Sequence, residues 1–215
     1  MDQNVQNDFQ NHLITSMAEL IESRDLNTGR HVKRTSEYVR IIAKNAKKAG
    51  YHKELLTDGY VEALVQCAPL HDVGKILVSD TVLNKPDKLS EREKESMRNH
   101  TINGRKVVKS ILGDFADPKY YHLACDIATY HHEHWDGSGY PEGLSGEEIP
   151  VSARIMAIAD VYDALVARRA YKDSMTSSDA FEIIESEAGS HFDPELVKIF
   201  IKSESEITGV MDHVS

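Results

Sequence analysis

Histidine and aspartate side chains are the strongest candidates for chemistry in this sequence, which contains eleven histidines. The segment His71-Asp72-Val73-Gly74-Lys75 places an imidazole beside a carboxylate, and adjacent side chains on a helix diverge by about 100°. Such a pair can offer one nitrogen ligand and one carboxylate to adjacent metal ions, with Asp72 as the bridge. Lys75 lies about one turn later and shares their face. An ordinary helix end with an exposed histidine and aspartate would also explain the segment.

A second pair of candidate ligands, His131 and His132, stands immediately before a glycine-rich stretch. Neutral histidine is the commonest metal ligand, and two adjacent imidazoles are hard to explain as packing. Asp160 falls within the strongly apolar segment 151–168, where a buried carboxylate is costly unless it is paired or bound to metal. Asp163 lies one turn later on the same face. A solvated helix end would also explain the histidines, and a nearby arginine would also explain Asp160.

The set is more informative than its members, because His31 and His100 are each weak candidates alone. Together with the residues above they make five histidines and two aspartates on five expected helices. Such a set can converge in the core of a helical bundle, as in carboxylate-bridged metal proteins. Nitrogen and oxygen donors without thiolate indicate iron, manganese or zinc, and argue against a cysteine-based structural zinc site.

Composition narrows the classes of protein. The 215 residues, 40% hydrophobic and 28% charged, suit one globular domain. A net charge of −10 argues against a protein that coats DNA or RNA, and means that an anionic substrate needs local cations. No apolar run approaches the roughly 20 residues of a membrane span, and the N-terminus lacks signal-peptide features. Cys67 and Cys125 show no CxxC spacing, which favours a reducing, cytoplasmic location.

The elements that must position these residues are helical in pattern, without a run of alternating strands. We therefore expect an all-α fold, a single bundle of six to eight helices. A capping box at Ser90–Glu93 and the pair Asp193-Pro194 mark two helix starts. Segment 134–150, with four glycines and two prolines, is expected to be a long functional loop. The expected helices cover about 8–23, 28–48, 53–68, 90–112, 118–133, 151–168, 177–188 and 194–203.

With these residues in place, the sequence resembles the HD-domain metal-dependent phosphohydrolases, and within them the HD-GYP subfamily. His31, His71-Asp72 and Asp160 resemble the H…HD…D ligand set, and His132–Pro141 resembles the HHExxDGxGYP signature. Further segments match in order and spacing: Gly143-Leu144, Arg154-Ile155, Asp160–Leu165 and Arg169–Lys172. The resemblance covers residues 20–200 or so.

This resemblance implies a bacterial phosphodiesterase that hydrolyses cyclic di-GMP with two or three iron or manganese ions; zinc stays an alternative. Asp72 would bridge the metals, and Lys75 would lie beside them and a substrate phosphate. The metal ligands implied by the resemblance are His31, His71, Asp72, His100, His131, His132 and Asp160.

The resemblance also implies substrate contacts. Tyr140 and Pro141 would shape the pocket around guanine or sugar, and Asp163 is assigned to substrate binding as well. Arg169 and Lys172 would hold the phosphates, a role that their spacing of one turn also supports, although a solvated basic helix end would explain them equally.

One position departs from the family pattern. Trinuclear members carry a glutamate four residues before the first histidine, whereas this chain has Asn27 there. Because a neutral amide is a poor substitute for a carboxylate on a hard cation, we expect a binuclear centre without a third metal. The departure bears on whether hydrolysis stops at linear pGpG or continues to GMP.

The expected mechanism follows from two metals that share a bridging water and lower its pKa, so that hydroxide attacks phosphorus in line with the leaving oxygen. Lys75, Arg169 and Lys172 would offset the charge that develops. Two alternatives stay open: the same chemistry on another cyclic dinucleotide or nucleotide, and a nucleotide-binding or interaction module that turns over weakly.

The expected organisation has three parts: a polar segment and helix at 1–23, a catalytic domain at 24–203 and a tail at 204–215. The first helix is explained equally well by core packing or by a role as a linker or homodimerisation helix. Related proteins usually carry an upstream sensory or receiver domain, so the chain is either a stand-alone enzyme or a fragment of a longer protein.

Overall fold

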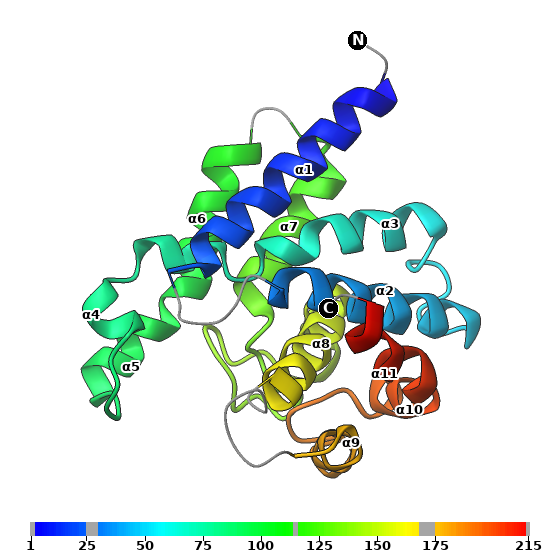
Figure 1. The fold of residues 1–215 in the computed structure, drawn as a ribbon. Helices are drawn as coiled ribbons and strands as arrows, with labels where there is room; N and C mark the ends of the chain where they lie inside the picture. Colours follow the sequence, from blue (N-terminus) through cyan, green and yellow to red (C-terminus); the bar gives the residue numbers. More distant parts are fainter. Residues whose placement is uncertain (1–2, 25–29, 114–115, 168–174, 214–215) are drawn as a thin grey trace.

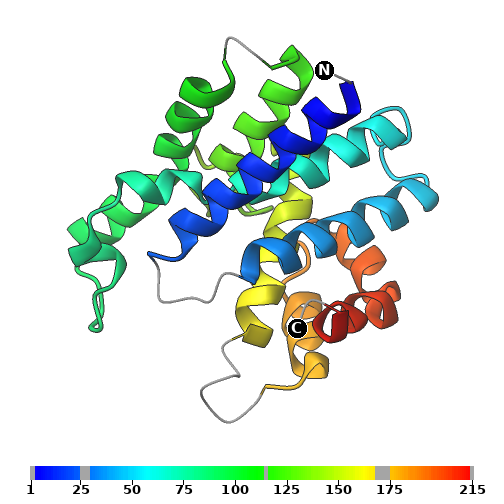
Figure 2. The same cartoon turned by 45° about the horizontal axis from the view of Figure 1, so that its top comes forward.

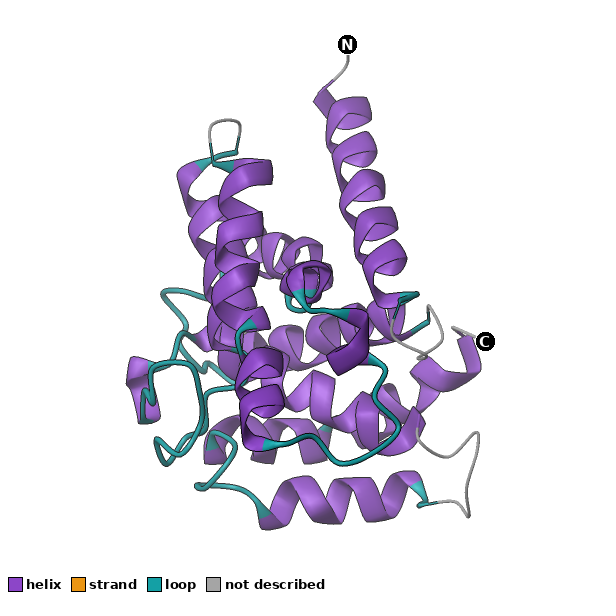
Figure 3. Ribbon diagram, turned by 90° about the vertical axis from the view of Figure 1, so that its left-hand side faces the viewer, coloured by secondary structure: helices purple, strands orange, loops and turns teal. Residues whose placement is uncertain are grey.

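The computed structural model describes residues 3–24, 30–113, 116–167 and 175–213, and within them every named element is helical (Figures 1 and 3). This confirms the all-α prediction. The α-helices are α1 (Gln3–Glu22), α2 (His31–Lys48), α3 (Asp58–Cys67), α4 (Asp80–Leu83), α5 (Glu91–Arg98), α6 (His100–Leu112), α7 (Pro118–Tyr130), α8 (Val151–Ala167), α9 (Ser177–Ser186), α10 (Pro194–Lys202) and α11 (Glu204–His213). Three 3₁₀ turns join them: η1 (Ala68–Leu70), η2 (Val73–Leu77) and η3 (Gly146–Glu148).

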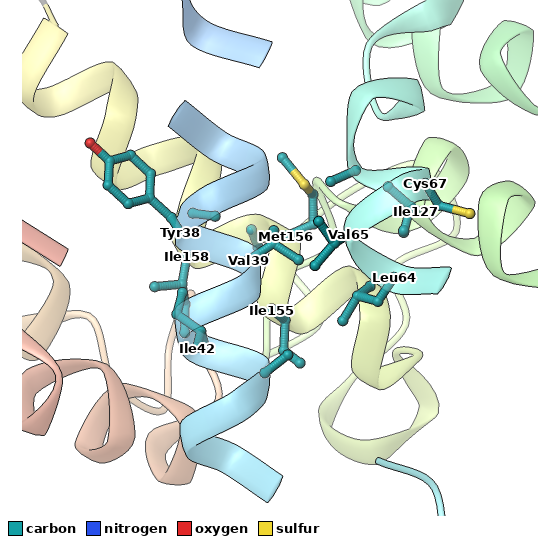
Figure 4. Close-up of a cluster of buried hydrophobic side chains, with 14 of the residues drawn as sticks. Tyr38, Val39, Ile42, Leu64, Val65, Cys67, Ile127, Ile155, Met156 and Ile158 are labelled. Carbon is teal, nitrogen blue, oxygen red and sulfur yellow. The ribbon is translucent and has the colours of Figure 1, made fainter. Parts of the chain in front are cut away.

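Helix α8 is the centre of the domain, and α2 and α7 pack against it (Figure 1). Twelve of its residues are buried, in line with a sequence that is apolar nearly all round. Tyr162 of α8 meets Tyr38 of α2 edge to face, with ring centroids 5.0 Å apart. Figure 4 shows Ile42 of α2 and Ile155 and Ile158 of α8 in the same buried cluster. This core holds the helices that carry the candidate ligands.

Local sequence signals explain several helix starts. The Ser90 side chain accepts from the Glu93 amide while the Glu93 carboxylate accepts from the Ser90 amide, so the predicted capping box is present. Asp193 accepts from the Glu195 amide at 2.8 Å and places Pro194 in the first turn of α10. Thr57 caps α3, which therefore begins at Asp58 and not at residue 53.

The structure corrects three expectations. It has eleven α-helices in the described residues, more than the six to eight expected, partly because the segment 90–112 is divided at Asn99 into α5 and α6. Asp72 does not lie on an α-helix; it follows η1 and precedes η2. The expected tail 204–215 contains α11, which buries Ile207 and Val210 and packs on α2.

Helix α1, blue in Figure 2, lies on one side of the domain. Ile14, Ala18 and Ile21 are buried, and the helix contacts η1 and η2. On the same helix Leu13, Met17 and Leu20 are exposed, with 71% of Leu20 accessible. The helix therefore combines core packing with an exposed apolar stripe at spacings of four and three residues.

Candidate metal centre

The seven predicted ligands come from five separate parts of the chain and meet at one site. Two groups of ligand atoms form, each with all atoms within 4.8 Å of one another. Asp72 belongs to both groups, so its carboxylate lies between them. The first group is Asp72, His100, His131 and His132, and the second is His31, His71 and Asp72. Asp160 Oδ1 lies 3.4 Å from His31 Nε2 and 3.9 Å from His71 Nε2, which adds a carboxylate to the second group.

Hydrogen bonds on the far side of each ring set the orientation of four histidines. Nδ1 of His71 donates to the Ala68 carbonyl at 2.8 Å, that of His100 to Met97 at 2.8 Å and that of His131 to Ile127 at 2.9 Å. A carbonyl oxygen can only accept, so Nδ1 carries a proton in these three rings. His31 Nδ1 is 2.7 Å from Asp163 Oδ2. Each Nε2 is thereby left to face the centre, as in histidine ligands of metals.

The inward nitrogens of neighbouring rings lie close to each other in both groups. His31 Nε2 is 3.3 Å from His71 Nε2, and His100 Nε2 is 3.4 Å from His131 Nε2. His100 and His131 both have pKa values below the usual one, so their rings are neutral with the proton on Nδ1, and their contact brings two lone pairs face to face. Asp72 Oδ1 is buried there without a hydrogen-bond partner. A divalent ion in each group would satisfy the nitrogens and the oxygen together, so the donor set fits metal.

The two oxygens of Asp72 point to different groups, as a bridge requires. Oδ2 is 3.4 Å from His71 Nε2, whereas Oδ1 is 3.3 Å from His100 Nε2 and 3.9 Å from His131 Nε2. Lys75 Nζ contacts Oδ2 at 2.8 Å. Burial opposes ionisation of Asp72, but Lys75 and His71 hold its pKa well below the usual range. The carboxylate is therefore ionised and able to neutralise bound cations.

The two groups differ in their affinity for protons. Burial lowers the pKa of His131 well below its usual value and that of His132 to about 4. Burial also acts to lower the pKa of His71, but Asp72 and Asp160 together raise it to about 9. The pKa of His31 is raised in the same direction, since Asp163 and Asp160 outweigh burial. The second group thus holds positive charge strongly, as a proton or as a metal ion.

Asp163 is not placed to contact a substrate, which corrects its predicted role. Asp163 is fully buried. Arg34 donates two hydrogen bonds to its carboxylate, from Nε to Oδ1 at 2.6 Å and from Nη2 to Oδ2 at 2.8 Å. Its Oδ2 also meets His31 Nδ1. Asp163 therefore orients the candidate ligand His31 through the ring nitrogen that faces away from the centre. The only sign of this role in the sequence is the position of Asp163 one turn after Asp160 on α8.

Close backbone contact brings the His71-Asp72 segment against α6. A Cβ added to Gly74 would lie 1.9 Å from the His100 carbonyl oxygen and 2.3 Å from the Gly104 nitrogen. Only glycine permits this approach, which holds Asp72 beside His100. Gly74 is thus required for the first ligand group, a role that its place between Asp72 and Lys75 did not reveal.

The glycine-rich segment forms the expected loop and covers one side of the centre. The buried Glu133 carboxylate accepts from the amides of Glu142 at 2.8 Å, Gly143 at 3.1 Å and Leu144 at 3.1 Å, and so folds the loop back on itself. Tyr140 stacks on His132, with ring centroids 4.8 Å apart at 27°. Tyr140 and Pro141 are both partly exposed beside the ligands. Sequence reasoning missed the folding role of Glu133, although its place directly after His132 was a signal.

Arg98 brings a positive charge close to this loop. The Arg98 guanidinium lies 5.1 Å from the centroid of the Tyr140 ring, at the end of α5, and Arg98 is exposed. Sequence reasoning missed Arg98, because nothing in an exposed helix end indicates that Tyr140, which is distant in sequence, lies against it. Three other predicted residues, Asn27, Arg169 and Lys172, fall in segments 25–29 and 168–174 and lie outside the described residues.

Similarity to known proteins agrees with this geometry. The chain matches the HD domain family over residues 15–196. It is 42% identical over 200 residues to a cyclic di-GMP phosphodiesterase of Vibrio cholerae, covering 93% of this chain and 41% of that protein. It is 36% identical over 198 residues to 3'3'-cGAMP-specific phosphodiesterase 2 of the same organism, covering 92% and 35%. The chain thus spans less than half the length of these relatives.

A crystal structure of a cyclic GMP-AMP specific phosphodiesterase of V. cholerae has the same fold. It superposes with a TM-score of 0.64 at 21% identity, over 94% of this chain and 51% of that one. Among the described helices, none has the length and apolar character needed to cross a membrane. Sequence, fold and the histidine–aspartate centre agree, and the chain belongs to the HD domain family, as its resemblance to the HD-GYP subfamily predicted.

Proposed function

We propose that this chain is a metal-dependent phosphodiesterase domain that hydrolyses cyclic di-GMP to linear pGpG, GMP or both. The observation that carries the proposal is Asp72, whose two oxygens face two separate groups of histidine nitrogens. A shared carboxylate of this kind is typical of two-metal sites that cleave phosphate esters. The resemblance of His132–Pro141 to the HD-GYP signature and the names of the relatives supply the substrate class.

The proposed cofactors are two divalent ions, iron or manganese, with zinc as the alternative. Mixed imidazole and carboxylate donors without thiolate suit these metals. When bound, they would supply Lewis-acid activation of water and of the scissile phosphate. His100, His131 and His132 would hold one ion and His31, His71 and Asp160 the other, with Asp72 between them. A third ion is not proposed, because Asn27 stands where trinuclear relatives carry glutamate.

The chain's own residues would bind and orient the dianionic substrate. Lys75, whose Nζ contacts Asp72, would donate to a phosphoryl oxygen beside the centre. Tyr140 and Pro141 would support a base or sugar, and the exposed Arg98 would attract the phosphates. Arg169 and Lys172 keep their predicted role as phosphate ligands. These cations explain how a chain with a net charge of −10 would accept an anion.

A second candidate substrate is a mixed cyclic dinucleotide such as 3'3'-cGAMP. It is favoured by the 36% identity to a phosphodiesterase named for that specificity. Both substrates carry the same phosphodiester bond, so the metal centre would not distinguish them and the residues that contact the bases would.

We further propose that α1 joins two copies of the chain or connects it to an upstream sensory or receiver domain. Leu13, Met17 and Leu20 form its exposed apolar stripe, and 44% of Leu13 is accessible. The a/d-type spacing of these residues suits a parallel two-helix contact. Sedimentation of the parent chain and of Leu13→Glu tests the dimer; a monomeric parent would contradict it.

The function is tested by anaerobic incubation of Fe(II)- or Mn(II)-loaded protein with cyclic di-GMP and with 3'3'-cGAMP. Products are resolved by chromatography, and Asp72→Ala is run in parallel. We expect hydrolysis by the parent and none by the variant, with the ratio of pGpG to GMP reporting the extent of reaction. A parent that retains two metals and cleaves neither substrate would refute the proposal and favour a binding module.

A further inference from the structure

Arg24, just beyond the end of α1, is hydrogen-bonded to the segment that carries Lys75. Its Nη1 donates to the carbonyl oxygens of Lys75 at 3.2 Å and Ile76 at 3.1 Å, and its Nη2 donates to that of Val78 at 3.1 Å. Nη2 also pairs with Asp80 Oδ1 at 2.7 Å. One guanidinium thus joins four residues that follow Asp72.

The carbonyl oxygens that Arg24 binds lie in the last turn of η2 and directly after it. The turn η2 (Val73–Leu77) is a five-residue 3₁₀ helix, and the last carbonyls of a helix carry partial negative charge. The Lys75 carbonyl already accepts from the Val78 amide at 3.0 Å, and Arg24 adds a second, charged donor to it. A planar guanidinium offers several donors in fixed directions, which suits adjacent carbonyls better than the single ammonium of lysine. Arg24 therefore acts as a side-chain cap on the end of η2.

Arg24 is itself held in place from the other side. Its carbonyl oxygen accepts from Asn84 Nδ2 at 3.0 Å. The preceding helix α1 is anchored by the buried Ile14, Ala18 and Ile21. The guanidinium thus projects from a packed helix onto η2, and only 28% of its side chain is exposed.

Lys75 stands at the junction of this contact and the candidate centre. Its carbonyl binds Arg24, while its Nζ lies 2.8 Å from Asp72 Oδ2. The backbone position of Lys75 therefore decides where its ammonium stands relative to the bridging carboxylate and to a phosphate beside it. A small displacement of a positioned donor is enough to lower a rate substantially.

We propose that Arg24 is a positioning residue that sets the location of Lys75, which makes the end of α1 part of the catalytic unit. The inference rests on the proposed function, since it assigns Lys75 to the substrate phosphate. It adds a residue that neither binds metal nor faces the substrate.

The first test is hydrogen exchange of the segment 73–80, measured by mass spectrometry on metal-loaded protein. Arg24→Ala is expected to speed exchange of these amides about tenfold or more, and Arg24→Lys less, while α10 stays unchanged. Arg40→Ala is the matched control, because Arg40 pairs with Glu37 within helix α2 and not with the segment 73–80. Exchange in segment 73–80 that is the same in parent and Arg24→Ala would overturn the proposal.

The second test is a double-mutant cycle on turnover of cyclic di-GMP. Arg24→Ala is expected to lower kcat about tenfold with KM changed less than about twofold, but to change kcat less than about twofold when Lys75 is already alanine. A merely structural role would give the same loss in both backgrounds, and that result would overturn the proposal. Arg24→Lys keeps the charge and is expected to recover part of kcat, which guards against misfolding of the alanine variant.

The two tests separate the inference from the proposed function. A metal-loaded parent that cleaves no cyclic dinucleotide contradicts the proposed function and the kinetic role of Arg24 together. The exchange experiment does not depend on turnover, and it decides by itself whether Arg24 holds the Lys75 segment.

Discussion

Replacing Asp163 by asparagine should weaken metal binding although Asp163 is not a ligand. Asp163 Oδ2 faces His31 Nδ1 at 2.7 Å and Arg34 Nη2 at 2.8 Å, while Oδ1 faces Arg34 Nε at 2.6 Å. An amide in the same place has one oxygen and one NH₂ group. Whichever way the amide is turned, its NH₂ meets at least one N–H donor of Arg34 or His31.

The size of the effect follows from these contacts. Loss of the group that orients a histidine ligand typically costs about 10–100-fold in metal affinity, or about 1.4–2.7 kcal/mol. Arg34 also loses the charge of its buried partner, so we expect the free energy of unfolding to fall by about 3 kcal/mol. The first effect should be confined to the ion near His31, so that one of the two bound metals is lost first.

The assay is a competition titration of Mn(II) against a chelator, with thermal unfolding measured in parallel. Asp193→Asn is a matched control: Asp193 is also buried and pairs with Arg154 at 2.7 Å, but it does not touch a candidate ligand. It should lower stability comparably and leave metal affinity within about threefold. Folded Asp163→Asn protein that binds both metals within about twofold of the parent would refute the reasoning.

Three further predictions follow from the site. Gly74→Ala should destabilise the fold by about 3 kcal/mol, because its Cβ would overlap the His100 carbonyl, whereas Gly59→Ala, with open space around it, should change stability by less than about 1 kcal/mol in urea unfolding. Arg98→Ala should raise KM about three- to tenfold with little change in kcat, since an exposed cation acts in ground-state binding; an unchanged KM in steady-state assays would contradict this. Metal affinity should rise about tenfold per pH unit between about pH 6 and pH 8, because the pKa of His71 is raised to about 9 and a metal must displace its proton. The raised pKa of His31 acts in the same direction, and a flat titration series would contradict this.

Most ligands of the candidate centre could be predicted, because their residue types and order along the chain carry the information. His71-Asp72 and His131-His132 are adjacent pairs, and the sequence alone indicates that they can offer metal ligands. The structure brings both pairs together with Asp160. The helix starts at Ser90 and Asp193 were also predictable, since capping depends on residues within one turn.

Other features depended on distant contacts and could not be predicted. The break at Asn99 between α5 and α6 interrupts a continuous helical pattern, and His100, the next residue, binds the Met97 carbonyl through its ring. Segment 204–213 looks like a tail by itself, yet Ile207 is fully buried once α11 reaches α2. Helical periodicity does not reveal which partner a face will find.

Asp160 and Asp163 of α8 have different roles, and only part of that difference follows from the sequence. The sequence by itself determined that α8 carries two carboxylates one turn apart in an apolar helix, and that at least one needs a partner or a metal. Only the tertiary structure decided which is which, because Arg34, 129 residues away, binds Asp163 and leaves Asp160 to face His31 and His71. Residue type and spacing are local properties, whereas the partner of a buried charge is set by the packing of α2 against α8.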